Sequence, residues 1–209
     1  MLYNDTRMPV LLAHNHRKTP LEIKNTPLLG SLLPTKLNAH VSVDFRDLLK
    51  REYHLTTSGL HYKMGLIDPT FVHNRETGDV KKLNSEDREE LRWLYQESYP
   101  DNWFNERMLQ TGHYYGIKIN RRIVSVAGVH VFSEKYRVAA LGNITTHPAY
   151  RNRGFAEEVT AHLCQQLFNR VDHIGLNVHS NNRSAIRCYQ KLGFEIVGHY
   201  EECSLKRMD

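Results

Sequence analysis

Hydrophobic and polar positions change their period several times along the chain, and each change marks an expected element. In the front part, alternation at residues 38–43 predicts a strand, and residues 60–66 are a further strand candidate. A shorter apolar run predicts a strand at 9–13, and the run at 28–33 is expected to end a helix. Asp44 is expected to cap a helix that carries Phe45 and Leu49 on one face.

The pattern in the back part predicts strands and helices in mixed order. Ser85 is expected to cap a helix whose face holds Leu91, Leu94 and Tyr95, and a second short helix is expected around Met108. Strands are predicted at 80–83, 113–119, 123–132, 136–146, 173–179, 194–200 and 202–206, and long helices at 154–168 and 182–192. This order indicates an α/β (α+β) sandwich around a mixed sheet.

Residues 68–84 carry turn formers and charges, among them Asp68-Pro69 and the Asn74–Gly78 stretch. We therefore expect a linker or boundary there. The predicted domains are 1–78 and 79–209.

Composition restricts the function classes only weakly. The chain has 209 residues and a formal net charge of +5, which suits nucleic acid or an anionic small ligand equally well. The three cysteines show no C-x-x-C spacing and are expected to be reduced thiols. His14 and His16 lack a third ligand at recognisable spacing, so we expect no metal. Because no apolar run is long enough to span a membrane and no secretory leader is visible, we expect a cytoplasmic protein.

A strand–turn–helix stretch at residues 143–156 carries the first candidate chemistry. Gly154 opens a helix, and free backbone N–H groups at a helix start, aided by the helix dipole, bind phosphate. Arg151 and Arg153 add positive charge. The stretch is neither a Walker loop nor a G-x-G-x-x-G fingerprint, and taken alone it also fits an ordinary turn.

The helix expected at 182–192 carries a second candidate. Asn182 is expected to cap it, and Tyr189 lies two turns later on the same face. Ala185 lies between them and leaves room for a ligand. A single tyrosine on an amphipathic helix is by default a residue of the hydrophobic core.

The two stretches together resemble the GCN5-related N-acetyltransferase (GNAT) family. The resemblance rests on the Arg-x-x-Gly-x-Ala hexad at 151–156 and on Asn-x-x-Ala-x-x-x-Tyr-x-x-x-Gly-Phe at 182–194. It covers residues 80 to about 206. The version with Gly-Asn-Ile-Thr-Thr-His-Pro-x-Tyr-Arg at 142–151 is most similar to the glycine N-acyltransferase-like branch. By the same resemblance, residues 1–78 are expected to be a partial, degenerate acetyltransferase-like half.

The resemblance implies a splayed central sheet flanked by helices and a site for acetyl-CoA. Backbone groups of Ile144, Thr145 and Thr146 would pair with the pantetheine arm, and Asn182 would contact the cofactor. Tyr189 would lie near the thioester sulfur as the catalytic acid. Backbone amides at the helix start would hold the pyrophosphate. Those amides belong to Arg151, Asn152, Arg153, Gly154, Phe155 and Ala156.

The implied activity is acetyl transfer from acetyl-CoA to a primary amine, with a small amine or amino acid favoured. The family's usual glutamate base is missing, because residues 138–150 contain no acidic side chain. His130, His147, His179 or a water held by Asn143 and Thr145 remain candidates. A protein N-terminal acetyltransferase and a non-catalytic acyl-CoA-binding module are the alternatives. Nucleic acid is an unlikely partner, and a homodimer is possible.

Overall fold

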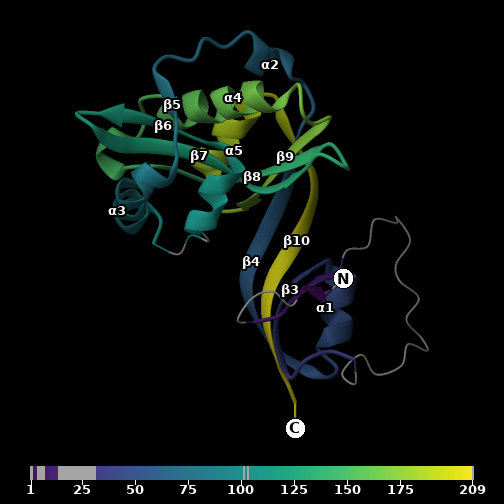
Figure 1. Cartoon of the computed structure of the whole chain (residues 1–209). Helices are drawn as coiled ribbons and strands as arrows, with labels where there is room; N and C mark the ends of the chain where they lie inside the picture. The colour runs from purple at the N-terminus through teal and green to yellow at the C-terminus, as the bar shows by residue number, and fades with distance from the viewer. Residues whose placement is uncertain (1, 4–7, 14–31, 101, 103, 209) are drawn as a thin grey trace. The chain divides into compact units, whose positions relative to one another are not determined.

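The computed structural model describes residues 2–3, 8–13, 32–100, 102 and 104–208 (Figure 1). The chain forms two compact units. The first unit combines residues 1–63, 178–181 and 197–209, and the second combines 64–177 and 182–196. The chain therefore returns to the first unit twice, briefly at residues 178–181 and again from residue 197.

The first unit is a small sheet covered by one helix. Its strands follow the order β1-β2-β3-β10-β4, with β2 parallel and β10 antiparallel to β3. Its elements are β1 (Leu2–Tyr3), β2 (Val10–Ala13), β3 (Lys36–Val41), α1 (Val43–Leu49) and parts of β4 (Tyr53–Leu66) and β10 (Phe194–Arg207).

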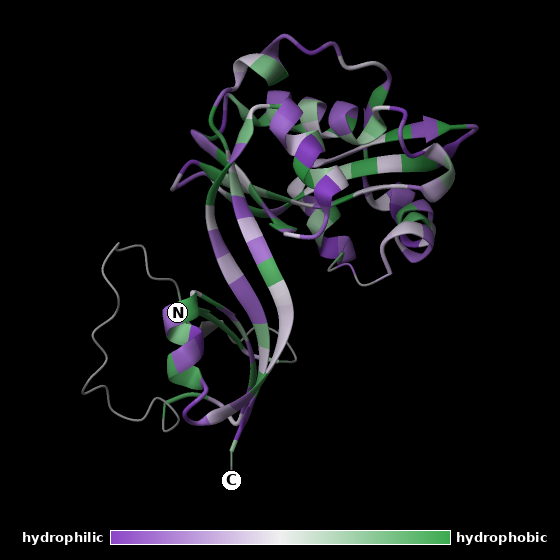
Figure 2. Cartoon of the chain, turned by 180° about the vertical axis from the view of Figure 1, so that it is seen from behind, coloured by the Kyte–Doolittle hydropathy of each residue, from purple (hydrophilic) through white to green (hydrophobic). Residues whose placement is uncertain are grey.

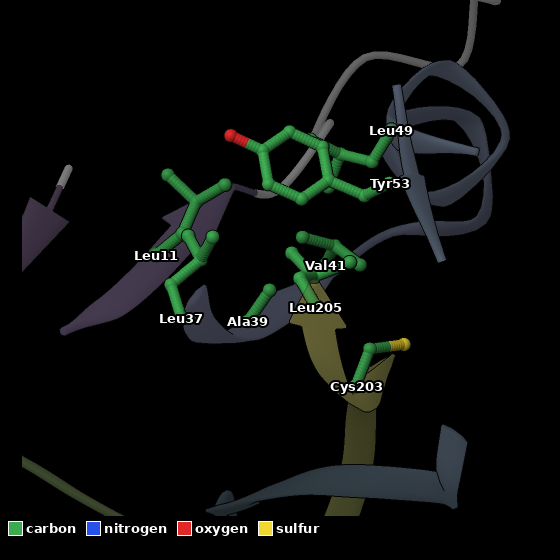
Figure 3. Packing of buried hydrophobic residues seen from close by; sticks show 8 residues of the cluster. All are labelled: Leu11, Leu37, Ala39, Val41, Leu49, Tyr53, Cys203 and Leu205. Carbon is green, nitrogen blue, oxygen red and sulfur yellow. The ribbon is translucent and has the colours of Figure 1, made fainter. Parts of the chain in front are cut away.

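The core of the first unit draws on both ends of the chain. Figure 3 shows its buried side chains converging from β2, β3, α1, β4 and β10. The members are Leu11, Leu37, Ala39, Val41, Leu49, Tyr53, Cys203 and Leu205. The Tyr53 hydroxyl donates to the Pro34 carbonyl at 3.0 Å, so this buried polar group is satisfied.

Several expectations for the first unit need correction. The helix is capped by Ser42 and not by Asp44, because the backbone stays extended through Ser42 and Asp44 already lies in the first turn. The strands β4 and β10 are each 14 residues long, so β4 begins well before residue 60 and β10 replaces the two strands expected at 194–206. Most of the expected helix end at 28–33, and both His14 and His16, lie outside the described residues.

The second unit has a mixed sheet in the order β4-β9-β8-β7-β6-β5. The pairs from β5 to β8 are antiparallel, and β8 and β9 are parallel. The helix α4 packs on β6, β7 and β8, and α3 packs on β7 and β8 from the other side (Figure 1). Its elements are α2 (Thr70–His73), β5 (Val80–Lys82), η2 (Ser85–Asp87), α3 (Arg88–Ser98), η3 (Glu106–Thr111), β6 (Tyr114–Ile119), β7 (Arg122–Ser133), β8 (Val138–Thr146), η4 (Pro148–Tyr150), α4 (Phe155–Leu167), β9 (His173–His179) and α5 (Arg183–Lys191).

The expected mixed architecture is confirmed, and its helices are amphipathic. Bands of both hydropathy classes run along α4 in Figure 2, and its buried side chains include Val159, Leu163 and Leu167. Asn84, rather than Ser85, caps the helical stretch before α3. Its Oδ1 accepts from the Glu86 amide at 2.7 Å, while Asp87 accepts from the Asn84 amide at 2.9 Å.

The segment expected to be a linker is ordered and clamped to α4. Residues 68–78, which we call the strap, contain α2 with the fully buried Val72. The Gln165 side chain on α4 donates to the carbonyls of Val72 and Arg75 at 2.8 and 2.9 Å. Turn formers and charges here therefore mark a loop with fixed contacts. The division at 78/79 as a domain boundary stays a prediction.

Candidate active site

The site begins where β8 and β9 separate. They pair in parallel from Val138–Leu141 to His173–Leu176, and the pairing then ends although β8 continues to Thr146. Within the described residues, β8 has no β9 partner from Gly142 onward. Unpaired N–H and C=O groups on a strand edge accept an extended ligand as if it were another strand. The expected splayed sheet is thus confirmed.

A kink at Asn143 shapes this free edge. Its φ is +53°, and the β7–β8 register shifts beside it. The Tyr95 hydroxyl donates to the Asn143 carbonyl at 2.9 Å, and the Asn143 amide donates to the Tyr114 hydroxyl at 2.9 Å. Burial raises the pKa of Tyr114 to about 12 and that of Tyr95 well above its usual value. Both phenols therefore stay protonated and hold the kink in place.

Asn143 also presents an unsatisfied atom. The side chain is 4% exposed, and its Oδ1 is buried with no hydrogen-bond partner among the described residues. A buried carbonyl oxygen left unpaired costs about 1–3 kcal/mol. The atom is available to accept from an N–H or a water at the kink.

The two threonines after the kink use their side chains to brace the fold. The Thr145 hydroxyl donates to Ser98 Oγ at 3.1 Å, and Thr146 Oγ1 lies 2.8 Å from Ser125 Oγ. Both threonines are buried, and Ile144 between them is half-buried. The Thr145 carbonyl also accepts from the Ser125 hydroxyl at 3.3 Å. The backbone groups of Ile144, together with the threonine groups that the fold leaves unused, are therefore what this stretch can offer to a ligand.

The turn after β8 exposes a helix start without a side-chain cap. Asn152 and Gly154 both have positive φ, +61° and +82°, and residues 151–154 are exposed. No side chain caps α4, so the first N–H groups of this 13-residue helix face outward. The dipole adds about half a positive charge there. These features fit a diphosphate.

The two arginines of this turn are positioned by local contacts. Arg151 donates to the carbonyls of Thr146 at 3.2 Å and Ser98 at 3.4 Å, which ties the turn to β8 and α3. The Arg153 guanidinium lies 5.3 Å from the centre of the Tyr150 ring. A guanidinium has five N–H donors, so both keep donors for an anion.

The two acidic residues in the first turn of α4 have hydrogen-bonding partners, which weakens their electrostatic repulsion of a bound anion. Glu157 accepts from Arg75 at 2.7 Å and from Lys191 at 2.8 Å. Glu158 accepts from the Gly78 amide at 2.7 Å. Both carboxylates are therefore held by groups of the strap and α5.

The helix α5 carries the second motif. Asn182 is confirmed as its cap, because Oδ1 accepts from the Ala185 amide at 3.2 Å and leaves the amide nitrogen as a donor. Tyr189 is 7% exposed, and its ring centre lies 6.1 Å from that of Phe194. Burial, with smaller effects of Cys188 and Tyr99, raises the pKa of Tyr189. Its hydroxyl therefore stays protonated at neutral pH and can donate a hydrogen bond.

The three histidines considered as bases each have a local structural contact. His147 Nδ1 accepts from the Ala149 amide at 3.2 Å, and its ring stacks 5.1 Å from Trp93. His130 covers Gly142, where a Cβ would lie 2.5 Å from its ring. His179, in the first unit, accepts at Nδ1 from the Asn181 amide at 3.1 Å.

A comparison with family models decides the class. Residues 80–194 match the model of the acetyltransferase (GNAT) family, which is more than half of the chain. The chain belongs to the acetyltransferase (GNAT) family. This GNAT chain carries both motifs, the splayed strands and the uncapped helix start inside the matched region. The family generally transfers an acyl group from acetyl-CoA.

Solved structures agree on the fold. A GNAT-family protein from Novosphingobium aromaticivorans has 23% identity and a TM-score of 0.64, covering 74% of this chain and 68% of that one. A GNAT-family acetyltransferase from Colwellia psychrerythraea has 15% identity and a TM-score of 0.63, covering 82% and 65%. A Drosophila protein has 12% identity and a TM-score of 0.70, covering 98% and 72%. No curated protein matched the chain.

The sequence analysis did not identify some residues of this site. Tyr95 and Tyr114 appear in the pattern only as apolar positions, and their hydroxyl contacts to Asn143 arise from packing. Arg75 lies in the strap, outside both motifs. Among the described residues, no group of three or more His, Cys, Asp or Glu side chains is placed to hold a metal. No helix in the described part of the chain is long and apolar enough to cross a membrane.

Proposed function

We propose that this chain transfers an acetyl group from acetyl-CoA to the nitrogen of a small primary amine or amino acid. The glycine N-acyltransferase-like form of residues 142–151 supports a small acceptor. One observation carries the proposal: the free edge of β8 after Leu141 leads directly to the uncapped start of α4. In acetyl-CoA an extended pantetheine arm is followed by a diphosphate, and these two parts match the free strand edge and the helix start in that order.

Binding is assigned to backbone groups. Ile144 and its two threonine neighbours pair with amide groups of the arm, as a further strand would. The amides of residues 151–156 hold the diphosphate, supported by the α4 dipole. The free amide nitrogen of Asn182 donates to the same arm, and the small Ala185 leaves space beside it.

The chemistry follows from the groups around the free edge. Acetyl-CoA supplies an activated acyl thioester. The amine nitrogen forms a bond to the carbonyl carbon, and backbone N–H groups of β8 stabilise the negative charge that develops on the oxygen. The carbon–sulfur bond then breaks, and Tyr189 protonates or hydrogen-bonds the leaving sulfur, with the proton released by the amine balancing the one that the thiolate takes up.

The amine must lose a proton, and β8 offers no carboxylate for it. Asn143 Oδ1, buried and without a partner, is placed to accept from the amine or from a water that passes the proton outward. His130, His147 and His179 remain candidates for the final acceptor. A pH–rate profile of kcat/KM compared between the wild type and the three His→Ala variants identifies which of them titrates in the reaction.

Two measurements test the proposed function. Calorimetry with acetyl-CoA should show binding, and release of free thiol across a panel of amines should show turnover with small amines. Turnover only with peptide N-termini would favour a protein N-terminal acetyltransferase. Binding without turnover on any amine would favour a regulatory acyl-CoA-binding module, and absence of binding would contradict the proposal.

The role of Tyr189 makes a separate prediction. Tyr189→Phe removes the proton donor and keeps the ring, so kcat should fall by about tenfold or more, with KM for acetyl-CoA little changed. Thiol release measures both constants. Tyr136→Phe, at a tyrosine that is 69% exposed, is the matched control and should retain full kcat. Equal kcat in wild type and Tyr189→Phe would refute the role.

A further inference from the structure

Beside the diphosphate turn lie two shallow hollows that the motifs do not explain. The inner hollow, of about 380 Å³, lies between the turn and the strap, and its lining residues are Arg75, Glu76, Thr77, Gly78, Arg153, Gly154 and Glu158. The outer hollow, of about 440 Å³, continues from the shared Arg75 and Glu76 toward the end of α5. Its lining residues are Thr70, Phe71, Asn74, Arg75, Glu76 and Lys191.

The outer hollow has a preformed wall. The strap is held to α4 by the two Gln165 hydrogen bonds, and the ring of His73 stacks 4.1 Å from Phe168. At its other end, the amides of Ile67 and Asp68 donate to the Gly193 carbonyl. The hollow therefore needs little ordering before a ligand binds.

The donors of the outer hollow suit a phosphate. Arg75 and Lys191 share the carboxylate of Glu157, and the exposed Glu76 balances the second positive charge, so the attraction comes from the exposed N–H donors and not from a net charge. Their side chains are 33% and 65% exposed, whereas Glu157 is only 15% exposed. The donors thus face solvent and the carboxylate lies beneath them. An Arg and a Lys beside each other are the usual ligands of a phosphate.

The same hollow offers a surface for an aromatic base. Phe71 is 56% exposed although it is a large apolar side chain on a clamped segment. A purine that covers its ring would gain favourable base–aromatic stacking. Glu76, exposed at the junction of the hollows, is an acceptor for a ribose hydroxyl or an exocyclic amine.

We propose that the outer hollow binds the adenosine 3′-phosphate end of coenzyme A, with Arg75 and Lys191 on the 3′-phosphate and Phe71 against the purine. This inference rests on the proposed function, which puts the diphosphate at Gly154 next to the inner hollow. The family model begins at residue 80, so the strap residues are a feature of this chain outside the matched region. The strap is then a cofactor-recognition element.

Comparing coenzyme A with dephospho-coenzyme A tests this inference, because the two differ only in the 3′-phosphate. Charged hydrogen bonds contribute about 1.5–3 kcal/mol, so the wild type should bind coenzyme A about tenfold more tightly or better. The Arg75→Gln/Lys191→Gln double variant is made together with Glu157→Gln, so that no unpaired carboxylate is left beside the start of α4. This triple variant should lose that preference while its Kd for dephospho-coenzyme A stays within about twofold. Lys135→Gln, an exposed lysine on the β7–β8 connection, is the matched charge control and should keep the preference.

A second variant addresses the purine and does not alter the ion pairs. Phe71→Ala should raise the Kd for coenzyme A and the Kd for dephospho-coenzyme A by a similar factor, so the ratio of the two Kd values should stay unchanged. Equal affinity of the wild type for the two nucleotides, or an unchanged ratio in the triple variant, would overturn the inference even if turnover of acetyl-CoA is intact. Absence of binding by either nucleotide together with absence of turnover would overturn the proposed function as well.

Discussion

At the scale of single residues, the kink at Asn143 and the phenols around it determine the free edge of β8. The described contacts make Tyr95 and Tyr114 structural partners of the kink, while Tyr189 is a buried donor on α5. All three have a raised pKa caused first by burial. Their protonation therefore links the site to the stability of the fold.

Alkaline pH should reveal this linkage. Tyrosine in the unfolded chain has a pKa near 10, while the folded value for Tyr114 is about 12. The stabilisation is fully present below pH 10 and is lost as pH rises toward the folded pKa, at about 1.4 kcal/mol per pH unit for each buried tyrosine. Urea unfolding followed by circular dichroism from pH 8 to 11 measures it.

Tyr114→Phe provides the comparison. The variant also loses the hydrogen bond to Asn143, which lowers its free energy of unfolding at every pH by about 1 kcal/mol. Its decline above pH 10 should nevertheless be shallower than that of the wild type, and Tyr136→Phe should follow the wild type. Parallel slopes for Tyr114→Phe and wild type would contradict a raised pKa.

At the scale of elements, the ends of the two motif helices differ in what they require. Gly154 precedes α4 and Gly193 follows α5, and both have positive φ, +82° and +86°. A Cβ on Gly154 would meet nothing within 4 Å, whereas a Cβ on Gly193 would lie 2.0 Å from the Asp68 carbonyl oxygen. Gly154 is thus needed for backbone conformation alone, and Gly193 also for the close approach of the strap.

This difference predicts unequal stability effects. Gly154→Ala should lower the free energy of unfolding by about 1–2 kcal/mol, the strain of an L-residue at positive φ. Gly193→Ala adds a backbone clash and should lower it by at least about 3 kcal/mol. Denaturant midpoints of both variants measure the two effects. Similar midpoints for Gly154→Ala and Gly193→Ala would show that the strap moves away from residue 193 at little cost, which would contradict the tight packing of the strap.

At the scale of the whole molecule, the chain builds one unit from its two ends and the other from its middle. The first unit needs β10, because Cys203 and Leu205 complete a core otherwise drawn from residues 11–53. Two buried thiols report on the two units: Cys203 belongs to the first, and the fully buried Cys164 belongs to the second. Burial raises the pKa of both thiols.

Leu205→Ala should therefore act on one unit. Truncating this buried side chain should cost about 2–5 kcal/mol and speed the labelling of Cys203 by a thiol reagent, while Cys164 stays protected. Mass spectrometry of labelled peptides follows the two sites. Leu163→Ala, beside Cys164 on α4, is the reciprocal variant. Equal acceleration at both cysteines in Leu205→Ala would show that the units open together.

The sequence alone determined what depends on neighbours in the chain. Period and turn chemistry predicted most strands and helices of the second unit, and the Asn182 cap, because these follow from contacts within a few residues. The two motifs located the exposed turn before α4 and the helix α5 for the same reason. Two N-cap predictions were wrong. The sequence pattern indicated Asp44 and Ser85, whereas the N-cap residues are Ser42 and Asn84, because a cap is the last residue with extended backbone before the helix.

Only the tertiary structure decided which distant segments meet. It showed that β8 loses its partner after Leu141, that Tyr95 and Tyr114 hold the kink at Asn143, and that the strap lies on α4. It also brought Arg75 and Lys191 to the one carboxylate of Glu157. Strand partners and ion pairs depend on long-range packing, which a local pattern of polar and apolar residues does not encode.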